Sequence, residues 1–328
     1  MNSRRVVVVG YDGVELIDVA CVTSGFYYAN QLGAAQAYHV VLATSAGRSM
    51  RCDSGLELRS ESRLDGIHGR IDTLVVSGGR GHEAAADNPR LVGQVRRLAE
   101  SARRVASVCT GATVLAAAGL LDGRRATTHW DYARRLAERF PKVNVDAAPI
   151  YIRDREVATS GGVTAALDLT LAFIEEDHGA ELARWVAMGM VTYLQRPGNQ
   201  AQMSLFTSIP RAPEQVLVRR VVDHVVSHLD ADLSAANLAA LVGVSERHLS
   251  RLFAEHVGQT PGRLVRHARL EAASRLLADT REPLSTIARQ CGFTSAESLR
   301  QAFVAGFGIP PSRFRAAHRT GLGSSRGA

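Results

Sequence analysis

A stretch near the C-terminal end of this chain occurs twice. Four positions recur fifty residues later: Leu249, Phe253, Gly258 and Pro261 become Leu299, Phe303, Gly308 and Pro311. Recurrence of the same residues at a fixed spacing indicates one supersecondary unit built in duplicate. The duplication therefore constrains the C-terminal part of the chain to two similar helical units.

Each copy has the pattern of a helix-turn-helix. An alanine stands four positions before a turn glycine, at Ala239 and Gly243 and again at Ala288 and Gly292. Polar residues after each glycine predict the N-cap of a second helix, whose Leu and Phe at i and i+4 face the core. The outward face of such a helix fits the major groove of duplex DNA.

The length and charge of the chain agree with two parts of different function. At 328 residues it exceeds one ordinary hydrophobic core, so we expect two domains. Residues 1–210 hold 23 Arg and Lys against 22 Asp and Glu, whereas residues 211–328 hold 16 against 10. The excess positive charge predicts a nucleic-acid partner for the duplicated half. A merely solvated basic surface is the alternative.

Composition also argues against several classes of protein. The four cysteines, Cys21, Cys52, Cys109 and Cys291, are too widely spaced for a disulfide framework or a structural zinc site. The apolar run 6–9 is short and is followed by acidic residues, so it predicts a strand and no signal peptide. No stretch approaches the ~20 apolar residues of a membrane span. We therefore expect a bacterial cytoplasmic protein without a bound metal.

Strand and helix patterns alternate along the first half of the chain. The expected strands lie at residues 6–9, 39–43, 73–77 and 105–108, with helices such as 88–103 between them. This alternation predicts an α/β domain: a mostly parallel sheet with helices on both faces, a flavodoxin-like sandwich.

The composition changes after this domain. We expect a linker at residues 196–213, which separates the α/β domain at 1–195 from an all-α domain at 214–320. The Gly- and Ser-rich tail at 321–328 predicts disorder.

A long helix at residues 261–277 is expected to join the two duplicated units. Leu264, Ala268, Ala272 and Leu276 follow one another at four-residue intervals. This spacing predicts one buried stripe along the helix.

Residues 214–320 resemble the AraC-type DNA-binding domain. The second unit carries the most specific match, PLSTIARQCGF at residues 283–293, followed by Phe303, Pro310-Pro311 and Phe314-Arg315. The resemblance implies two helix-turn-helix units on a connecting helix, with double-stranded DNA and RNA polymerase as partners.

Residues 1–195 resemble the ThiJ/PfpI branch of the class I glutamine amidotransferase-like superfamily. The matching elements are GVELID (13–18), DTLVVSGG (72–79), ASVCTGA (106–112), ATTHW (126–130) and TSGG (159–162). Chains that join these two domains in this order form a class of transcriptional regulators. The resemblance also implies a homodimer formed through the N-terminal domain. The same elements resemble isocyanide hydratase, which is an enzyme.

Cys109 is the candidate nucleophile of the N-terminal domain. It ends a predicted strand and precedes a helix, so a nucleophile elbow would expose its thiol at a helix N-terminus and lower its pKa. The N–H groups of Thr110 and Gly79 would then hold an anionic oxygen. By resemblance, Asp18 and His129 flank the sulfur as further catalytic candidates. The alternative is that the elbow only shapes a ligand pocket.

The candidate ligand-binding residues lie at the same edge of the predicted sheet. They are Asp18, Gly78, Gly79, Cys109, Thr110, His129, Gly161 and Gly162. The glycine pairs permit close backbone approach, and the alternative for either pair is that it only turns a loop. Neither has the spacing of a nucleotide-phosphate loop, so no cofactor is expected.

The candidate DNA-binding residues occupy the outward faces of the two second helices. They are Glu246, Arg247, Ser250 and Arg251 in the first unit and Ala296, Glu297, Ser298, Arg300 and Gln301 in the second. Arg247 and Arg251 suit guanine and Gln301 suits adenine, while a phosphate contact or a solvated side chain is the alternative for each.

Two functions follow from these patterns. The first is a DNA-binding transcriptional regulator controlled by a small ligand at the N-terminal domain, and the resemblance implies that this ligand contains nitrogen. The second is a cysteine-dependent hydratase or amidase with a DNA-binding appendage. Fusion to a DNA-binding domain favours the non-catalytic sensor.

Overall fold

The computed structural model describes residues 3–192, 196, 198, 202, 216–307 and 309–319. Contacts divide the chain into two compact units, Met1–Gln202 and Met203–Ala328, and each is considered by itself. The predicted tail and most of the predicted linker lie outside the described residues. Within the described part of the chain, no helix is long and apolar enough to cross a membrane.

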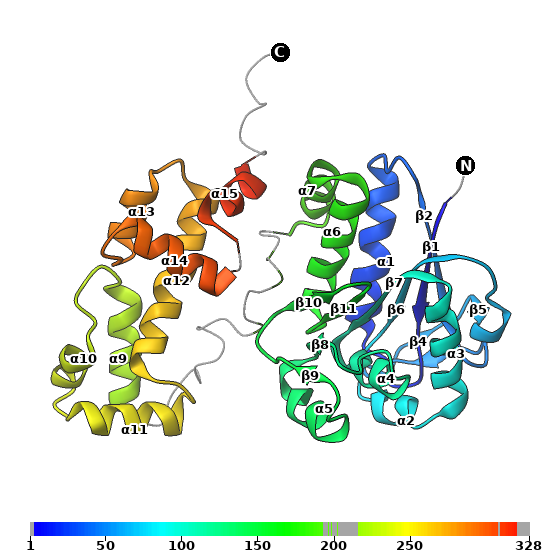
Figure 1. Ribbon diagram of the computed structural model, residues 1–328, viewed down its shortest axis with the longest axis horizontal. Coiled ribbons are helices and arrows are strands. Elements are labelled where there is room, and N and C mark those ends of the chain that lie inside the picture. The colour runs from blue at the N-terminus through cyan, green and yellow to red at the C-terminus, as the bar shows by residue number, and fades with distance from the viewer. Residues whose placement is uncertain are drawn as a thin grey trace, which may run out of the picture. The chain divides into compact units, whose positions relative to one another are not determined.

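The N-terminal unit is built on a seven-stranded sheet with the order β10-β11-β7-β6-β1-β2-β5 (Figure 1). Its strands are β1 (Arg4–Val9), β2 (Tyr38–Thr44), β5 (Ser62–Arg63), β6 (Ile71–Val76), β7 (Ala102–Val108), β10 (Tyr151–Asp154) and β11 (Val157–Ser160). All neighbours in the sheet are parallel except β10 and β11. Two short pairs accompany it: β3 (Met50–Arg51) with β4 (Glu57–Leu58), and β8 (Arg125–Ala126) with β9 (Asn144–Val145). The predicted mostly parallel sheet is confirmed.

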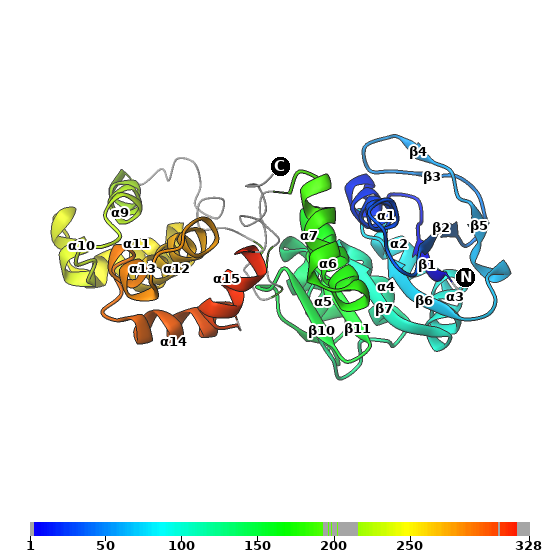
Figure 2. The same ribbon diagram turned by 90° about the horizontal axis from the view of Figure 1, so that it is seen from above.

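Helices cover both faces of this sheet (Figures 1 and 2). One face carries α1 (Leu16–Gln31), α6 (Thr164–His178) and α7 (Ala180–Gly189); the other carries α2 (His82–Ala86), α3 (Pro89–Glu100), α4 (Ala112–Ala117) and α5 (Ala133–Arg139). The valines of β1 explain the two cores, because successive side chains of a strand point to opposite faces. Val6 and Val8 pack in the first core, and Val7 and Val9 in the second.

The C-terminal unit is helical. It contains α9 (Val216–Ser227), α10 (Ala235–Leu241), α11 (Glu246–His256), α12 (Pro261–Asp279), α13 (Leu284–Gln290), α14 (Ala296–Phe307) and α15 (Pro311–Arg319). Leu249 and Phe253 belong to a core formed by α9, α10, α11 and the start of α12. Leu299 and Phe303 belong to a second core formed by the end of α12 with α13, α14 and α15.

The two helix-turn-helix units have the local geometry that the sequence predicts. Gly243 and Gly292 adopt left-handed φ values of 70° and 71° at the turns. The Ser245 hydroxyl accepts a hydrogen bond from the His248 N–H (3.2 Å) and caps α11. Ser295 caps α14 in the same way. Two helix-turn-helix units on a connecting helix are therefore confirmed.

The predicted buried stripe of the connecting helix is shifted in its second half, where Ala272 and Leu276 pack against the core but are only partly buried. Leu264 is buried as expected, but Ala273 and Leu277 are buried where Ala272 and Leu276 were expected. At 100° per residue, Ala273 lies roughly 180° around the helix axis from Leu264. The stripe changes side because the two cores pack against different sides of α12.

Candidate functional site

Cys109 occupies a strained position at the carboxyl end of β7. Its φ is 54°, and a 3-10 turn, η2 (Cys109–Gly111), leads directly into α4. Val163, which precedes α6, has a φ of 51°. Positive φ is uncommon for residues other than glycine, and such strain often accompanies functional sites. The Val163 N–H donates a hydrogen bond to the carboxyl of Asp18 (2.6 Å), and Asp18 lies next to Cys109 as described below.

The structure brings Asp18 and Cys109 together. Asp18, in the first turn of α1, accepts hydrogen bonds from the Val163 N–H at Oδ1 and from the Gly78 N–H at Oδ2 (3.2 Å). Gly78 lies next to both side chains, since a Cβ added there would lie 2.4 Å from Cys109 Cβ and 2.8 Å from Asp18 Oδ2. Burial raises the pKa of Asp18 to about 7, although these hydrogen bonds favour the carboxylate.

The prediction of an exposed, low-pKa thiol is wrong. The Cys109 side chain is buried, and burial followed by the nearby charge of Asp18 raises the pKa of the thiol well above its ordinary value. Gly162 closes the other side, where an added Cβ would lie 2.1 Å from Cys109 Cβ. Desolvation therefore outweighs the hydrogen bond from the Thr110 N–H, which favours the thiolate.

The two N–H groups predicted to hold an anionic oxygen are engaged within the protein. The Gly79 N–H donates to Thr110 Oγ1 (2.9 Å), and the Thr110 hydroxyl donates back to the Gly79 carbonyl (2.8 Å). The Thr110 N–H faces the Cys109 sulfur. The predicted role in an oxyanion hole is therefore wrong for the Gly79 N–H, and for the Thr110 N–H it stays a prediction.

His129 lies on the segment beside the Cys109 backbone. The hydroxyl of the preceding residue, Thr128, donates to the Cys109 carbonyl (2.9 Å). The His129 ring is half-buried and packs near Trp130 (5.6 Å between centroids) and Tyr132 (5.9 Å). Burial lowers the pKa of His129, so the neutral imidazole is favoured at neutral pH.

Two residues of this region were missed from the sequence. The Tyr11 hydroxyl donates to the Ser77 carbonyl (2.8 Å), next to Gly78. Its position two residues after the end of the first predicted strand was the signal that could have found it. Gln202 lies more than seventy residues from its partners Thr127 and Trp130, and no local pattern indicated it.

The glycine pair at 161 and 162 serves different neighbours. A Cβ at Gly161 would lie 2.5 Å from the side chain of Gln202, whereas Gly162 contacts Cys109. Their assignment to ligand binding stays a prediction.

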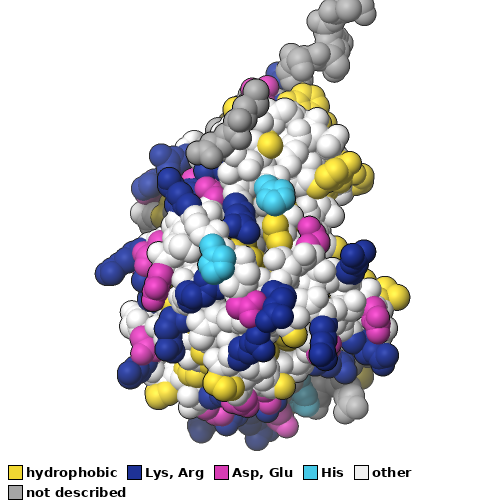
Figure 3. Space-filling model, turned by 90° about the vertical axis from the view of Figure 1, so that its right-hand side faces the viewer, with side chains coloured by type: hydrophobic (Ala, Val, Ile, Leu, Met, Phe, Trp, Pro, Cys, Tyr) yellow, Lys and Arg dark blue, Asp and Glu magenta, His cyan; other side chains and the backbone are white. Residues whose placement is uncertain are grey.

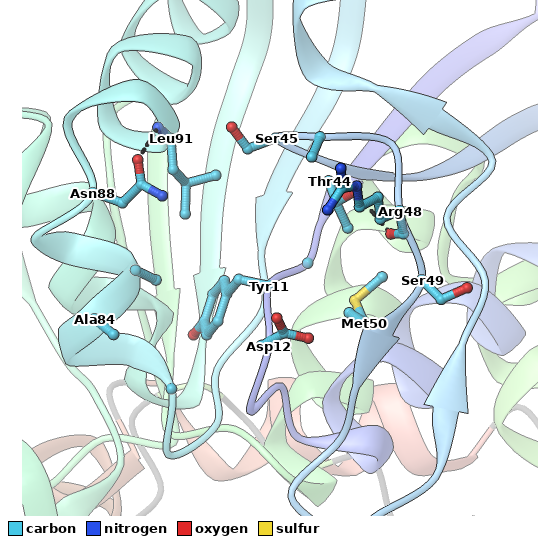
Figure 4. Close-up of a pocket in the computed structure, with 14 residues that line it drawn as sticks. Tyr11, Asp12, Thr44, Ser45, Arg48, Ser49, Met50, Ala84, Asn88 and Leu91 are labelled. Carbon is cyan, nitrogen blue, oxygen red and sulfur yellow. Dashed lines mark hydrogen bonds between the residues drawn. The ribbon is translucent and has the colours of Figure 1, made fainter.

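A cavity of ≈ 360 Å³ opens beside this cluster, at the carboxyl ends of β1 and β2 (Figure 4). Tyr11 lies on the side of α2, and Arg48 and Met50 on the side of β2 and β3. Because the Tyr11 hydroxyl reaches the Ser77 carbonyl, Tyr11 connects the wall of the cavity to the Asp18 and Cys109 cluster.

The predicted reading face of α11 is exposed. Glu246, Arg247, Ser250 and Arg251 all reach the surface, while Leu249 is fully buried. An Arg251 guanidinium nitrogen lies 3.2 Å from His248 Nδ1. The face therefore presents two arginines one helical turn apart.

The equivalent face of α14 is internally paired. Arg300 makes two hydrogen bonds to Glu297 (2.7 and 2.6 Å), and the Gln301 amide donates to the same carboxylate (2.9 Å). The Ser298 hydroxyl donates to the Ser295 carbonyl (2.9 Å) and so supports the start of the helix. Half-buried Ala296 and Ser298 are less available to DNA than the three exposed residues.

The surface of the N-terminal unit is mixed in charge. In Figure 3, Lys and Arg side chains are interspersed with Asp and Glu over the visible face. This agrees with the near balance of charge in residues 1–210. Among the residues that the structure describes, no three His, Cys, Asp or Glu side chains group as a metal site would require.

Comparisons with known proteins cover both units. The DJ-1/PfpI family profile matches residues 4–176, and a helix-turn-helix domain profile matches residues 238–317. The chain is 29% identical over 300 residues to the HTH-type transcriptional regulator GbdR of Pseudomonas aeruginosa, covering 92% of this chain and 81% of that protein. It is 32% identical over 324 residues to the HTH-type transcriptional regulator GlxA of Rhizobium meliloti, covering 96% and 97%.

An enzyme is also similar, over a shorter region. The isonitrile hydratase of Pseudomonas putida is 38% identical over 138 residues, which cover 41% of this chain and 58% of the enzyme. Similarity to the two regulators therefore extends over both units, whereas similarity to the hydratase covers less than half of the chain.

Proposed function

Because the chain belongs to the DJ-1/PfpI family and also carries a helix-turn-helix domain, we propose that it is a sequence-specific DNA-binding transcriptional regulator controlled by a small molecule. The observation that carries this proposal is the pair of helix-turn-helix units on α12, with Arg247 and Arg251 exposed on α11. Similarity to two transcriptional regulators over most of the chain supports it.

Each unit has a distinct role in this proposal. Residues 1–195 sense the effector, residues 196–213 connect, and residues 214–320 bind promoter DNA and contact RNA polymerase. The sensing unit forms a homodimer, so that two copies of the chain present four reading helices to repeated half-sites. The effector is a nitrogen-containing small molecule recognised where Asp18, Cys109 and His129 lie. The protein acts in the bacterial cytoplasm.

The environment of Cys109 supports sensing without turnover. A buried thiol with a raised pKa supplies little thiolate at neutral pH, and thiolate is the nucleophilic form. The strained strand-to-helix turn persists as the frame of a ligand site. Assays with isocyanides and small amides should show no turnover above that of Cys109→Ala, whereas activity that depends on Cys109 would favour the hydratase.

Base reading by α11 is the direct test of the regulator. Full-length protein is first used to select its preferred sequences from a library of random duplexes. Arg247→Ala and Arg251→Ala are then titrated against single-base variants of the selected sequence. Each should lose about 1–3 kcal/mol of discrimination at one base pair, because a bidentate contact to guanine is removed.

Arg134→Ala provides the matched control, since it removes one exposed arginine from α5 of the N-terminal unit. It should bind the selected duplex as the wild type does. If neither α11 variant changes base preference while both weaken all duplexes alike, these arginines contact only phosphates. A failure to select any sequence would reject the regulator itself.

A further inference from the structure

The side-chain amide of Gln202 lies in a polar recess of the N-terminal unit. Its nitrogen donates to the Thr128 carbonyl (2.7 Å), Thr127 Oγ1 (3.0 Å) and the Pro149 carbonyl (3.1 Å). Its oxygen accepts from the Trp130 backbone N–H (3.0 Å). Every polar atom of this amide is therefore matched by a group of the N-terminal unit.

The recess is held by the N-terminal unit independently of Gln202. Thr127 is fully buried, and its N–H donates to Thr159 Oγ1 on β11 (2.7 Å). Thr128, also buried, binds the Cys109 carbonyl through its hydroxyl. Gly161 forms the floor, where any side chain would collide with the Gln202 amide. The recess is thus linked to the backbone of Cys109 through Thr128.

The pattern of hydrogen-bonding groups selects one kind of ligand. Three oxygen acceptors surround one nitrogen position, and one N–H donor faces one oxygen position. A primary carboxamide presents two N–H donors, one of them shared between two of the three acceptors, and a carbonyl acceptor, so it matches both positions. A carboxylate has no donor and would place negative charge against three acceptor oxygens in a buried site.

We propose that this recess is the recognition subsite for a primary carboxamide of the effector, and that Gln202 is its internal competitor. The inference rests on the proposed sensing function and names the chemistry of its ligand. A ligand carboxamide takes the place of the Gln202 side chain and makes the same four hydrogen bonds beside His129 and Cys109.

Displacement of Gln202 changes the attachment of the segment that leads to the DNA-binding unit. Gln202 is the last residue of the N-terminal unit, and its own N–H donates to the Ala148 carbonyl (2.8 Å). Further back, Arg196 is held by buried Asp168 through its backbone N–H (2.8 Å) and its guanidinium (2.6 and 3.0 Å). The effector therefore releases the side-chain attachment of Gln202, while its backbone bond to Ala148 and the attachment at Arg196 stay in place.

The test measures binding of propionamide to the full-length protein by calorimetry, with propionate as the comparison ligand. Gln202→Ala should bind propionamide about tenfold tighter than the wild type, because an internal competitor lowers apparent affinity by the fraction of sites it occupies. Adding Thr127→Val should weaken that binding about tenfold, because one acceptor is lost. Gln31→Ala, an exposed glutamine on α1, should behave as the wild type.

Two results would overturn the proposal. One is that wild type and Gln202→Ala bind propionamide with equal affinity. The other is that Gln202→Ala binds propionate as tightly as propionamide. If Gln202→Ala does not fold by circular dichroism, Gln202→Glu is measured instead, since it keeps the length of the side chain but lacks the N–H donors.

A second arm tests the coupling to DNA. Saturating propionamide should shift the affinity of the wild type for its selected duplex and leave that of Gln202→Ala unchanged. An unchanged wild type would reject the coupling. The calorimetric experiment contains no DNA, so its result does not depend on whether the protein is a regulator. A failure of the carboxamide proposal is therefore distinguished from a failure of the regulator proposal.

Discussion

Cys109 combines a strained backbone with a thiol that lies between Gly78 and Gly162. Substitution of either glycine would force Cys109 to move, because the added Cβ would overlap the Cβ atom of Cys109. This enclosure explains why the pKa of a cysteine at the turn before α4 is raised instead of lowered. Position at the start of a helix favours the thiolate only where solvent or a partner charge also stabilises it.

Labelling with iodoacetamide should therefore spare Cys109. Cys21 is half-buried, with a pKa raised to about 11, whereas Cys109 is buried with a pKa raised further. We expect Cys21 to be alkylated fastest at pH 8, as followed by mass spectrometry of the digested protein. In urea, all four cysteines should react at similar rates, which serves as the control. Faster labelling of Cys109 than of Cys21 in the folded protein would contradict the burial argument.

Asp18 should make the N-terminal unit less stable as the pH rises. Its pKa is about 7 in the folded protein and 3.8 for the unperturbed carboxyl, so the folded state binds more protons between about pH 4 and 7. The contribution of Asp18 to the free energy of unfolding is fully present below this window and falls by up to about 4 kcal/mol across it. Asp18→Asn stays neutral and should lose this part of the pH dependence.

Tryptophan fluorescence during urea unfolding measures this effect, because both tryptophans, Trp130 and Trp185, lie in the N-terminal unit. Glu57→Gln, at an exposed position on β4, is the control and should keep the slope of the wild type. Parallel pH profiles for wild type and Asp18→Asn would show that the Asp18 carboxyl titrates near its ordinary value.

Among the elements, the two helix-turn-helix units differ at equivalent turns. Gly243 and Gly292 share a left-handed backbone, but only Gly292 is also crowded. A Cβ at Gly292 would lie 2.0 Å from the Leu229 carbonyl oxygen and 2.7 Å from the Arg269 guanidinium, whereas Gly243 has open space. Arg269 itself donates to the Leu229 carbonyl (3.0 Å), so the second turn is locked onto the α9–α10 connection.

Alanine substitution should reveal this difference. Gly243→Ala should cost about 1 kcal/mol from the left-handed backbone alone. Gly292→Ala should cost about 1–3 kcal/mol more, because the added methyl group overlaps backbone that cannot move freely. Urea unfolding followed by circular dichroism at 222 nm checks both variants, since the C-terminal unit is helical. Equal losses would mean that the neighbours of Gly292 relax without cost.

Over the whole molecule, charge and fold separate the two proposed activities. The excess of positive charge lies after residue 210, on the unit that carries α11 and α14. Residues 211–320 alone should bind duplex DNA, with an affinity that falls about 10³-fold between about 50 and 200 mM salt, since counterions are released from DNA. Electrophoretic mobility shifts over a salt series measure this dependence.

Residues 1–202 provide the control for that experiment, because they should not shift the duplex at any salt concentration. A folded 211–320 fragment without affinity at low salt would contradict the assignment. Affinity that does not depend on salt would show that contacts to phosphate are not what holds the complex together.

The sequence by itself determined the alternating pattern of the N-terminal unit and the duplicated helical pattern of the C-terminal unit. The valine run of β1, the alternation of strands and helices, and the duplicated Leu, Phe and turn glycines act locally or over one helical turn. Four parallel strands of the sheet (β1, β2, β6 and β7) and the two helix-turn-helix units followed from these patterns, whereas β5, β10 and β11 did not. The proximity of Asp18 and Cys109 came from resemblance, and the structure brings the two side chains to the same glycine, Gly78.

Only the tertiary structure decided what the site offers a ligand. The burial of Cys109, the reciprocal bonds of Gly79 and Thr110, and the place of Gln202 beside Thr127 depend on residues tens of positions apart. The side of α12 that is buried changes for the same reason, because two separate cores pack against it. Local patterns determine which residues lie at the end of a strand. The burial and the hydrogen-bond partners of these residues are determined by segments distant in the sequence that pack against them.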